Sequence, residues 1–227
     1  AGRVHRLRAP PKCPFRTLVC GAMTTNETSF FRASHPFPAL SDPLLPDLVR
    51  ARGGERALNI WCAACSSGQE PYSIAMLVHD IVGADPGWRV QLLATDISPA
   101  MLARTRAGVY SQFEVNRGLP AHFLARHFRK VGLEWEIAEP LRRMVETRLL
   151  NLDVELIGVP SMDIIFLRNV LIYFDIATKR QILSRIRRVM RPDGYLVLGG
   201  PETTLNLDDP FERVQTGRAP VYRPRGG

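Results

Sequence analysis

The chain has 227 residues, of which 45% are hydrophobic, and this size and composition suit one domain with one substantial core. It has no uninterrupted apolar run long enough to cross a bilayer, and its basic first 23 residues lack the apolar stretch of a secretory signal, so we expect a cytoplasmic protein. The net charge of +8 suits an acidic partner, which could be nucleic acid, a membrane surface or a glutamate-rich protein.

Residues 1–23 show no helical or strand period and are predicted to form a poorly ordered basic leader. From residue 57 onward, apolar strand-like runs alternate with amphipathic segments of helical length. The expected strands cover residues 58–62, 90–96, 163–168 and 195–199, and the expected helices cover residues 69–82, 99–107 and 177–190. This alternation predicts an α/β fold with a doubly wound, mostly parallel sheet.

Two short runs, residues 135–137 and 144–149, look like strands outside this alternation. They predict a small antiparallel β appendage at about residues 130–150 of a main domain that covers residues 24–222, followed by a tail at 223–227. Because ligands of doubly wound sheets gather at the carboxyl ends of the strands, the candidate site residues should lie there.

The first candidate segment, residues 61–70, places small side chains between a strand and a helix. Gly68 permits backbone dihedrals that other residues resist, although a plain tight turn would look the same, and the segment has no lysine that would make it a P-loop. Asp96 ends the next strand, where a carboxylate can accept hydrogen bonds from ribose hydroxyls. Glu70 is a second acidic candidate, although the helix dipole also favours an acidic residue in a first turn.

Residues 24–32 are polar at one end and doubly aromatic at the other. Taken alone, they predict a helix start, with Asn26 or Thr28 as the cap and with Phe30 and Phe31 packed inward.

Residues 166–174 read as a strand that runs into polar and aromatic side chains. Arg168 can hold a carboxylate with its planar fork, Asn169 can hydrogen-bond a ligand, and Tyr173 offers a hydroxyl. A buried strand with a structurally bonded tyrosine is the alternative, and Asn151 alone would be interpreted as a turn residue.

The cysteines favour packing over metal binding. Only Cys62 and Cys65 form a CxxC, and a zinc site would need further ligands at suitable spacing. The remaining cysteines and the histidines supply no second CxxC and no HxxxH (Cys13, Cys20, His5, His35, His79, His122 and His127). We therefore expect no metal, and we expect Cys62 and Cys65 to be buried in a turn from strand to loop.

Four blocks in fixed order resemble the CheR family: TNETSFFR (25–32), WCAACSSGQEPYS (61–73), LLATDIS (92–98) and FLRNVLIYF (166–174). CheR proteins are S-adenosylmethionine (SAM) dependent methyltransferases that esterify glutamates on bacterial chemoreceptors. The resemblance spans about residues 24–221 and implies a Rossmann-like methyltransferase fold. It also implies SAM as cofactor, S-adenosylhomocysteine as product and the cytoplasmic helical region of a chemoreceptor as partner.

The resemblance assigns roles residue by residue. The matching positions for SAM contacts are Asn26, Thr28, Arg32, Glu70, Asp96, Asn151, Leu152, Arg168 and Asn169. Arg32, Arg168 and Tyr173 would be the catalytic residues, and they would position the glutamate rather than deprotonate it. A glutamate carboxylate has a reference pKa of about 4.3, so it is already ionised at neutral pH.

Family members usually carry a small helical domain before the first block, and residues 1–23 are too short and proline-rich to form it, so we expect either that most of this domain is missing or that the sequence is truncated. Some members grip a tethered receptor peptide with a long loop in the β appendage. Residues 127–135 leave little room for such a loop, so we expect independence from the peptide, and a monomer.

Two alternative functions remain. A nucleic acid methyltransferase would commonly have an acidic residue or asparagine followed by Pro-Pro, where this chain reads LRNV (167–170). A catalytically silent module that binds SAM or a receptor is the other alternative, although every motif position expected for catalysis is filled.

Overall fold

The computed structural model describes residues 27–33, 36–83, 85, 87–200, 202, 204, 211–216 and 219–225. The predicted leader and the candidate residue Asn26 lie outside the described residues. Within them, the main sheet has seven strands, in the spatial order β6 (Val145–Leu149), β2 (Arg89–Asp96), β1 (Ala57–Ala63), β7 (Met162–Leu167), β8 (Met190–Leu198), β10 (Ala219–Pro224) and β9 (Phe211–Thr216).

The pairing of these strands confirms the doubly wound, mostly parallel sheet. Strand β1 is parallel to β2 and β7, and the flanking pairs β2–β6 and β7–β8 are also parallel. Within the described part of this sheet, the antiparallel pairs are those of β10 with β8 and with β9. The chain leaves β1 in one direction for β2 and β6 and then returns to β7 on the other side. The strand order therefore reverses at the carboxyl ends of β1 and β7, where such sheets bind ligands.

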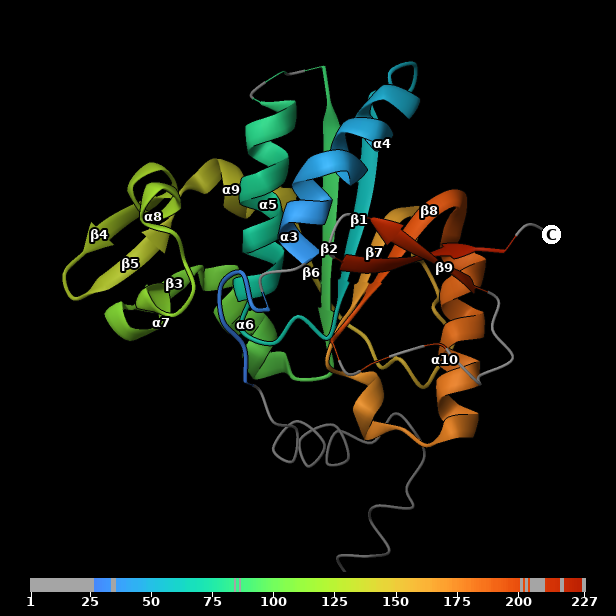
Figure 1. Ribbon diagram of the computed structural model, residues 1–227. Coiled ribbons are helices and arrows are strands. Elements are labelled where there is room, and N and C mark those ends of the chain that lie inside the picture. Colours follow the sequence, from blue (N-terminus) through green and yellow to red (C-terminus); the bar gives the residue numbers. More distant parts are fainter. Residues whose placement is uncertain are drawn as a thin grey trace, which may run out of the picture.

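Alternation along the strands separates two cores. Ile60 and Cys62 of β1 face one apolar cluster, which includes Ile74 of α5 (Gln69–Val82), whereas Trp61 faces a second cluster that includes Ile186 of α10 (Ile176–Val189). Successive side chains of a strand point to opposite faces, so one apolar strand contributes side chains to both cores. Figure 1 shows the result, with α5 and α10 on opposite sides of the sheet.

The remaining helical segments are short. They are α3 (Pro36–Ala39), η1 (Leu40–Leu44), α4 (Leu45–Ala51), α6 (Pro99–Ala107), α7 (Gln112–Asn116), α8 (Ala121–His127), α9 (Glu139–Met144) and η2 (Leu171–Tyr173). Among the described residues, no helix combines the length and the apolar character that crossing a membrane requires. Helix α6 begins as the sequence predicts, because the Ser98 hydroxyl accepts a hydrogen bond from the N–H of Met101.

The small antiparallel sheet exists, but one strand predicted for it lies elsewhere. It consists of β3 (Val109–Ser111), β5 (Glu134–Ile137) and β4 (Phe128–Val131), and it stands beside α5 and α9 (Figure 1). The sequence predicts that the run at residues 144–149 belongs to this appendage, and that prediction is wrong. It forms β6, which pairs in parallel with β2 at the edge of the main sheet. Such a short run carries no signal of its pairing partner.

Candidate active site

The loop after β1 is held in a strained conformation. Ala64 and Ser66 have positive φ angles of 59° and 51°, and Gly68 has a φ of 98° at the start of α5. A Cβ at Gly68 would lie 2.8 Å from the Tyr110 hydroxyl and 3.0 Å from Thr105, so both the backbone angle and the space require glycine. Positive φ at residues with side chains is uncommon and gathers at ligand-binding sites.

Asp96 ties the end of β2 to this loop. One carboxylate oxygen accepts the N–H of Ser66 at 2.9 Å and the other accepts the N–H of Ser98 at 2.8 Å. The side chain is almost wholly buried, and burial raises its pKa above 3.8, although the backbone donors oppose the shift. Each oxygen has a second lone pair, so the carboxylate can still accept hydrogen bonds from a ligand hydroxyl.

Arg168 joins three separate segments at the carboxyl end of β7. Its guanidinium pairs with the carboxylate of Glu70, and its Nη2 donates to the carbonyl oxygen of Arg32 at 2.7 Å. The thiol of Cys62 donates to the second Glu70 oxygen at 3.1 Å. Arg168 thereby contacts the side chain of Glu70 and the main chain of Arg32, whereas the Arg32 guanidinium donates to the carbonyl oxygen of Glu27.

The Arg168 side chain is buried, and its Nε has no hydrogen-bond partner among the described residues. The carboxylate that its fork holds is the protein's own Glu70. Contact between Arg168 and a substrate carboxylate therefore stays a prediction, whereas its positioning of the Arg32 segment follows from the geometry.

Glu202, a residue missed by the sequence analysis, organises the turn after β7. Its two carboxylate oxygens accept four backbone N–H groups, those of Asn169, Val170, Leu171 and Gly199, at 2.7 to 2.9 Å. Asn169 has a positive φ of 57°, so this carboxylate stabilises a strained turn that contains a predicted site residue. An acidic residue shortly after the end of a buried strand was the available signal.

The other predicted site residues lie around the same edge of the sheet. Tyr173 is 52% exposed in η2, and Asn151 accepts the N–H of Asp153 at 3.0 Å in a turn next to the end of β2. The Leu152 side chain packs in the core on the α10 face, and its carbonyl oxygen accepts a hydrogen bond from Arg185 Nη1 at 3.1 Å. Thr28 is half-buried before the aromatic pair.

The aromatic pair packs inward, as predicted, but residues 27–33 form a turn and no helix, so the helix start predicted from this segment alone is wrong. Phe30 is fully buried and contacts Tyr110 and Phe128 edge to face, and Phe31 stacks on Phe123. Because these rings anchor the chain, they also hold in place the polar residues on either side of them.

Cys62 and Cys65 are free and buried, and burial raises the pKa of both thiols well above their ordinary values. Both thiols are therefore protonated at neutral pH, and their position supports the packing role.

Comparisons with known proteins identify the family. A family model described as "CheR methyltransferase, SAM binding domain" matches residues 26–219. The chain is 43% identical over 214 residues to Chemotaxis protein methyltransferase 1 of Pseudomonas aeruginosa, which covers 92% of this chain and 78% of that relative. It is 39% identical over 226 residues to Chemotaxis protein methyltransferase Cher2 of Pseudomonas putida, with 98% and 82% covered. With its fold and clustered motif residues, the chain belongs to the CheR family of SAM-dependent chemotaxis protein methyltransferases.

Proposed function

We propose that this chain transfers the methyl group of SAM to glutamate side-chain carboxylates in the cytoplasmic helical region of a chemoreceptor, forming methyl esters. The observation that carries the proposal is the contact of Arg32, Glu70 and Arg168 at the carboxyl ends of β1 and β7 in a chain of this family. We also propose that the protein acts in the cytoplasm, as a monomer.

The residues at this edge suit SAM. The loop that contains Ala64, Ser66 and Gly68 has small side chains, which let its backbone pass close to a ligand, and Asp96 has lone pairs available for ribose hydroxyls. Glu70 and Asp96 are carboxylates, which favour a cationic ligand, and the pairing of Glu70 with Arg168 leaves no net positive charge at that point. Asn151 and Asn169 add amide groups from two neighbouring turns.

The reaction needs alignment rather than base catalysis. Bound SAM supplies a methyl group on a positively charged sulfur. The glutamate oxygen is already a nucleophile at neutral pH, and it forms the new bond to carbon as the carbon–sulfur bond breaks. Arg168 holds the Arg32 segment, and the turn after β7 carries Tyr173. These residues would fix the glutamate carboxylate in line with the bond between the methyl carbon and sulfur. Exclusion of water from the reacting pair would further increase the rate.

The linkage formed on the receptor tests this proposal. Receptor preparations methylated with radiolabelled SAM should release the label as methanol in mild alkali, because a carboxyl methyl ester is hydrolysed and an N-methyl group is not. Label that stays on the protein after alkali would refute glutamate esterification. The absence of any transfer, with SAM still bound, would favour a silent binding module.

Replacing Asp96 by alanine is expected to weaken S-adenosylhomocysteine binding by about 1.5–3 kcal/mol, because charge-assisted hydrogen bonds are lost. The change also frees the N–H of Ser66, so the loop loses an anchor. Calorimetric titration measures the effect, and Asp47→Ala, which removes an exposed carboxylate from α4, serves as the control. Unchanged affinity in Asp96→Ala would remove the ribose role.

Replacing Glu202 by glutamine is expected to lower the free energy of unfolding by about 2–4 kcal/mol. The glutamine NH₂ would face backbone N–H groups whose hydrogen bonds the carboxylate now accepts. Turnover should fall further than S-adenosylhomocysteine affinity, because the turn that carries Asn169 and Tyr173 relaxes. Denaturant unfolding and initial rates measure the two effects. The control is Glu212→Gln, at an exposed position of β9. Equal stability of the two variants would show that the hydrogen bonds accepted by Glu202 do not stabilise the turn.

We further propose that the enzyme is independent of a tethered receptor peptide. Strands β4 and β5 are joined by Gly132 and Leu133 alone, with Val131 paired to Glu134, which leaves no long loop to hold a peptide. A receptor C-terminal peptide should therefore show no saturable low-micromolar binding in a titration. Binding to the receptor helices should instead weaken as salt rises, because a basic surface meets acidic helices.

A further inference from the structure

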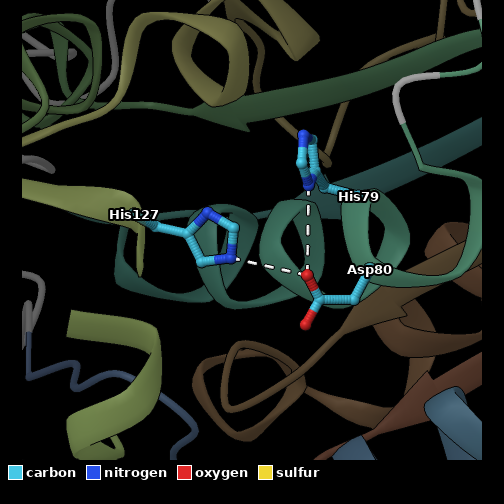
Figure 2. A group of neighbouring side chains, drawn as sticks. All are labelled: His79, Asp80 and His127. Carbon is cyan, nitrogen blue, oxygen red and sulfur yellow. Dashed lines mark ion pairs between the residues drawn. The ribbon is translucent and has the colours of Figure 1, made fainter. Parts of the chain in front are cut away.

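Two histidines and an aspartate converge at the end of α5, away from the candidate active site. His79 and Asp80 lie near the end of α5, and His127 is the last residue of α8 (Figure 2). His127 Nε2 lies 3.5 Å from Asp80 Oδ1, and His79 Nδ1 lies 3.9 Å from the same oxygen. The three ligand atoms all lie within 4.8 Å of one another.

The two imidazole nitrogens are buried and unsatisfied. Neither His79 Nδ1 nor His127 Nε2 has a hydrogen-bond partner within the described part of the chain, and the His127 residue is only 3% exposed. Buried polar atoms nearly always have a partner, so two such nitrogens aimed at one carboxylate oxygen require an explanation. The two rings lie edge to face with centroids 5.5 Å apart.

We propose that His79 Nδ1, Asp80 Oδ1 and His127 Nε2 bind a divalent transition-metal ion of the zinc class. Imidazole and carboxylate ligands suit such ions. Bond lengths of about 2.0–2.2 Å at a tetrahedral centre place ligand atoms about 3.3 Å apart, so the distances from His127 and His79 to Asp80 Oδ1 need to shorten by about 0.2 and about 0.6 Å. Asp80 is partly exposed, which gives the ion an entry path and leaves a position for water.

Arg126 is the one described cation at the site, with Nη1 2.9 Å from Asp80 Oδ1. Its side chain is mostly exposed and free to move, and the carboxylate has further lone pairs that could receive it. Metal binding would therefore break or weaken one exposed ion pair. Such pairs contribute little to stability.

The metal would have a structural role. His79 follows Glu70 by nine positions on the same helix, roughly 14 Å along its axis, so the ion would not reach the reacting groups. It would instead join α5, which packs on the main sheet, to the junction of α8 and β4, which leads into the small sheet. Such a link would hold the small sheet in place against the methyltransferase core.

Titration of the untagged, chelator-treated full chain with Zn²⁺ tests the proposal. We expect one saturable equivalent, with affinity at least tenfold lower in both His79→Gln and Asp80→Asn and unchanged in His122→Gln, an exposed histidine of α8. Thermal unfolding without metal verifies that the variants are folded, since His79 and Asp80 are only partly buried. Co²⁺ should give visible absorption bands without a thiolate band in the near ultraviolet.

Three outcomes would overturn the proposal. The first is the lack of saturable Zn²⁺ binding by the parent chain. The second is a loss of affinity below tenfold in either His79→Gln or Asp80→Asn. The third is a thiolate band with Co²⁺, which would place the metal on cysteines instead.

Discussion

Replacing Arg52 by methionine is expected to lower the free energy of unfolding by about 3–5 kcal/mol, the usual cost of removing one partner from a buried ion pair. Arg52 ends α4 and donates from Nε to Asp163 at 2.7 Å and from its two Nη atoms to Asp193 at 2.8 and 2.6 Å. Asp163 is fully buried in β7. Without Arg52, that carboxylate would keep only the N–H of Asn59 at 2.7 Å and a longer contact to Arg191.

Arg50→Met is the matched control, because it makes the same change two residues earlier, in the last turn of α4. Arg50 pairs with Asp47 on the surface, so its loss should cost at most about 1 kcal/mol. Urea unfolding of both variants measures the difference. Equal effects of the two changes would show that the Arg52 network contributes no more than a surface pair.

The same network predicts a dependence on pH. Hydrogen bonds from Arg52 lower the pKa of Asp193 below 3.8. A lowered carboxyl pKa stabilises the fold at pH values above the unfolded-state pKa, and this stability is lost as the pH falls through the lower, folded-state pKa. The parent chain should therefore lose stability below about pH 4 more steeply than Arg52→Met. Asp193 is half exposed, so the effect should be small.

Most of the sheet could be predicted from sequence because apolar runs and amphipathic segments are local signals. The helix at residues 69–82 and the cap at Ser98 are confirmed residue by residue. The helix expected at residues 177–190 ends at Val189, and Pro192-Asp193-Gly194 lies within β8 as an irregularity, where Met190 pairs with Met162 and Tyr195 already pairs with Ile164. Backbone pairing with β7, which decides this assignment, is not a local property.

The site was predictable as a set of residues and not as a set of contacts. Motif order placed Glu70 and Arg168 in one site, but their pairing joins positions 98 residues apart, and nothing in either motif indicates that each is the other's partner. Glu202 was missed because its role depends on backbone N–H groups of a turn more than 30 residues earlier. The cluster of His79 with His127 likewise depends on how α8 packs beside α5.

Replacing Arg168 by methionine is expected to abolish most methyl transfer and to destabilise the fold. The mostly buried carboxylate of Glu70 would lose its cation, at a cost of about 3–5 kcal/mol, and the Arg32 segment would lose the donor to its carbonyl oxygen. A displacement of about 1 Å in a positioning group can reduce a rate about 100-fold, so we expect a loss of at least this size in kcat/KM. Arg143→Met, which breaks an exposed ion pair in α9, is the control.

Arg168→Lys separates charge from geometry at the same position. A lysine ammonium can still neutralise Glu70, but it lacks the planar fork that reaches Glu70 and the Arg32 carbonyl together. We therefore expect this variant to recover most of the stability lost in Arg168→Met while its turnover stays at least about tenfold below that of the parent, with S-adenosylhomocysteine affinity less affected. Urea unfolding, initial rates and calorimetry measure these quantities. Full turnover in Arg168→Lys would show that a positive charge beside Glu70 suffices, and the positioning of the Arg32 segment by the fork would then be wrong.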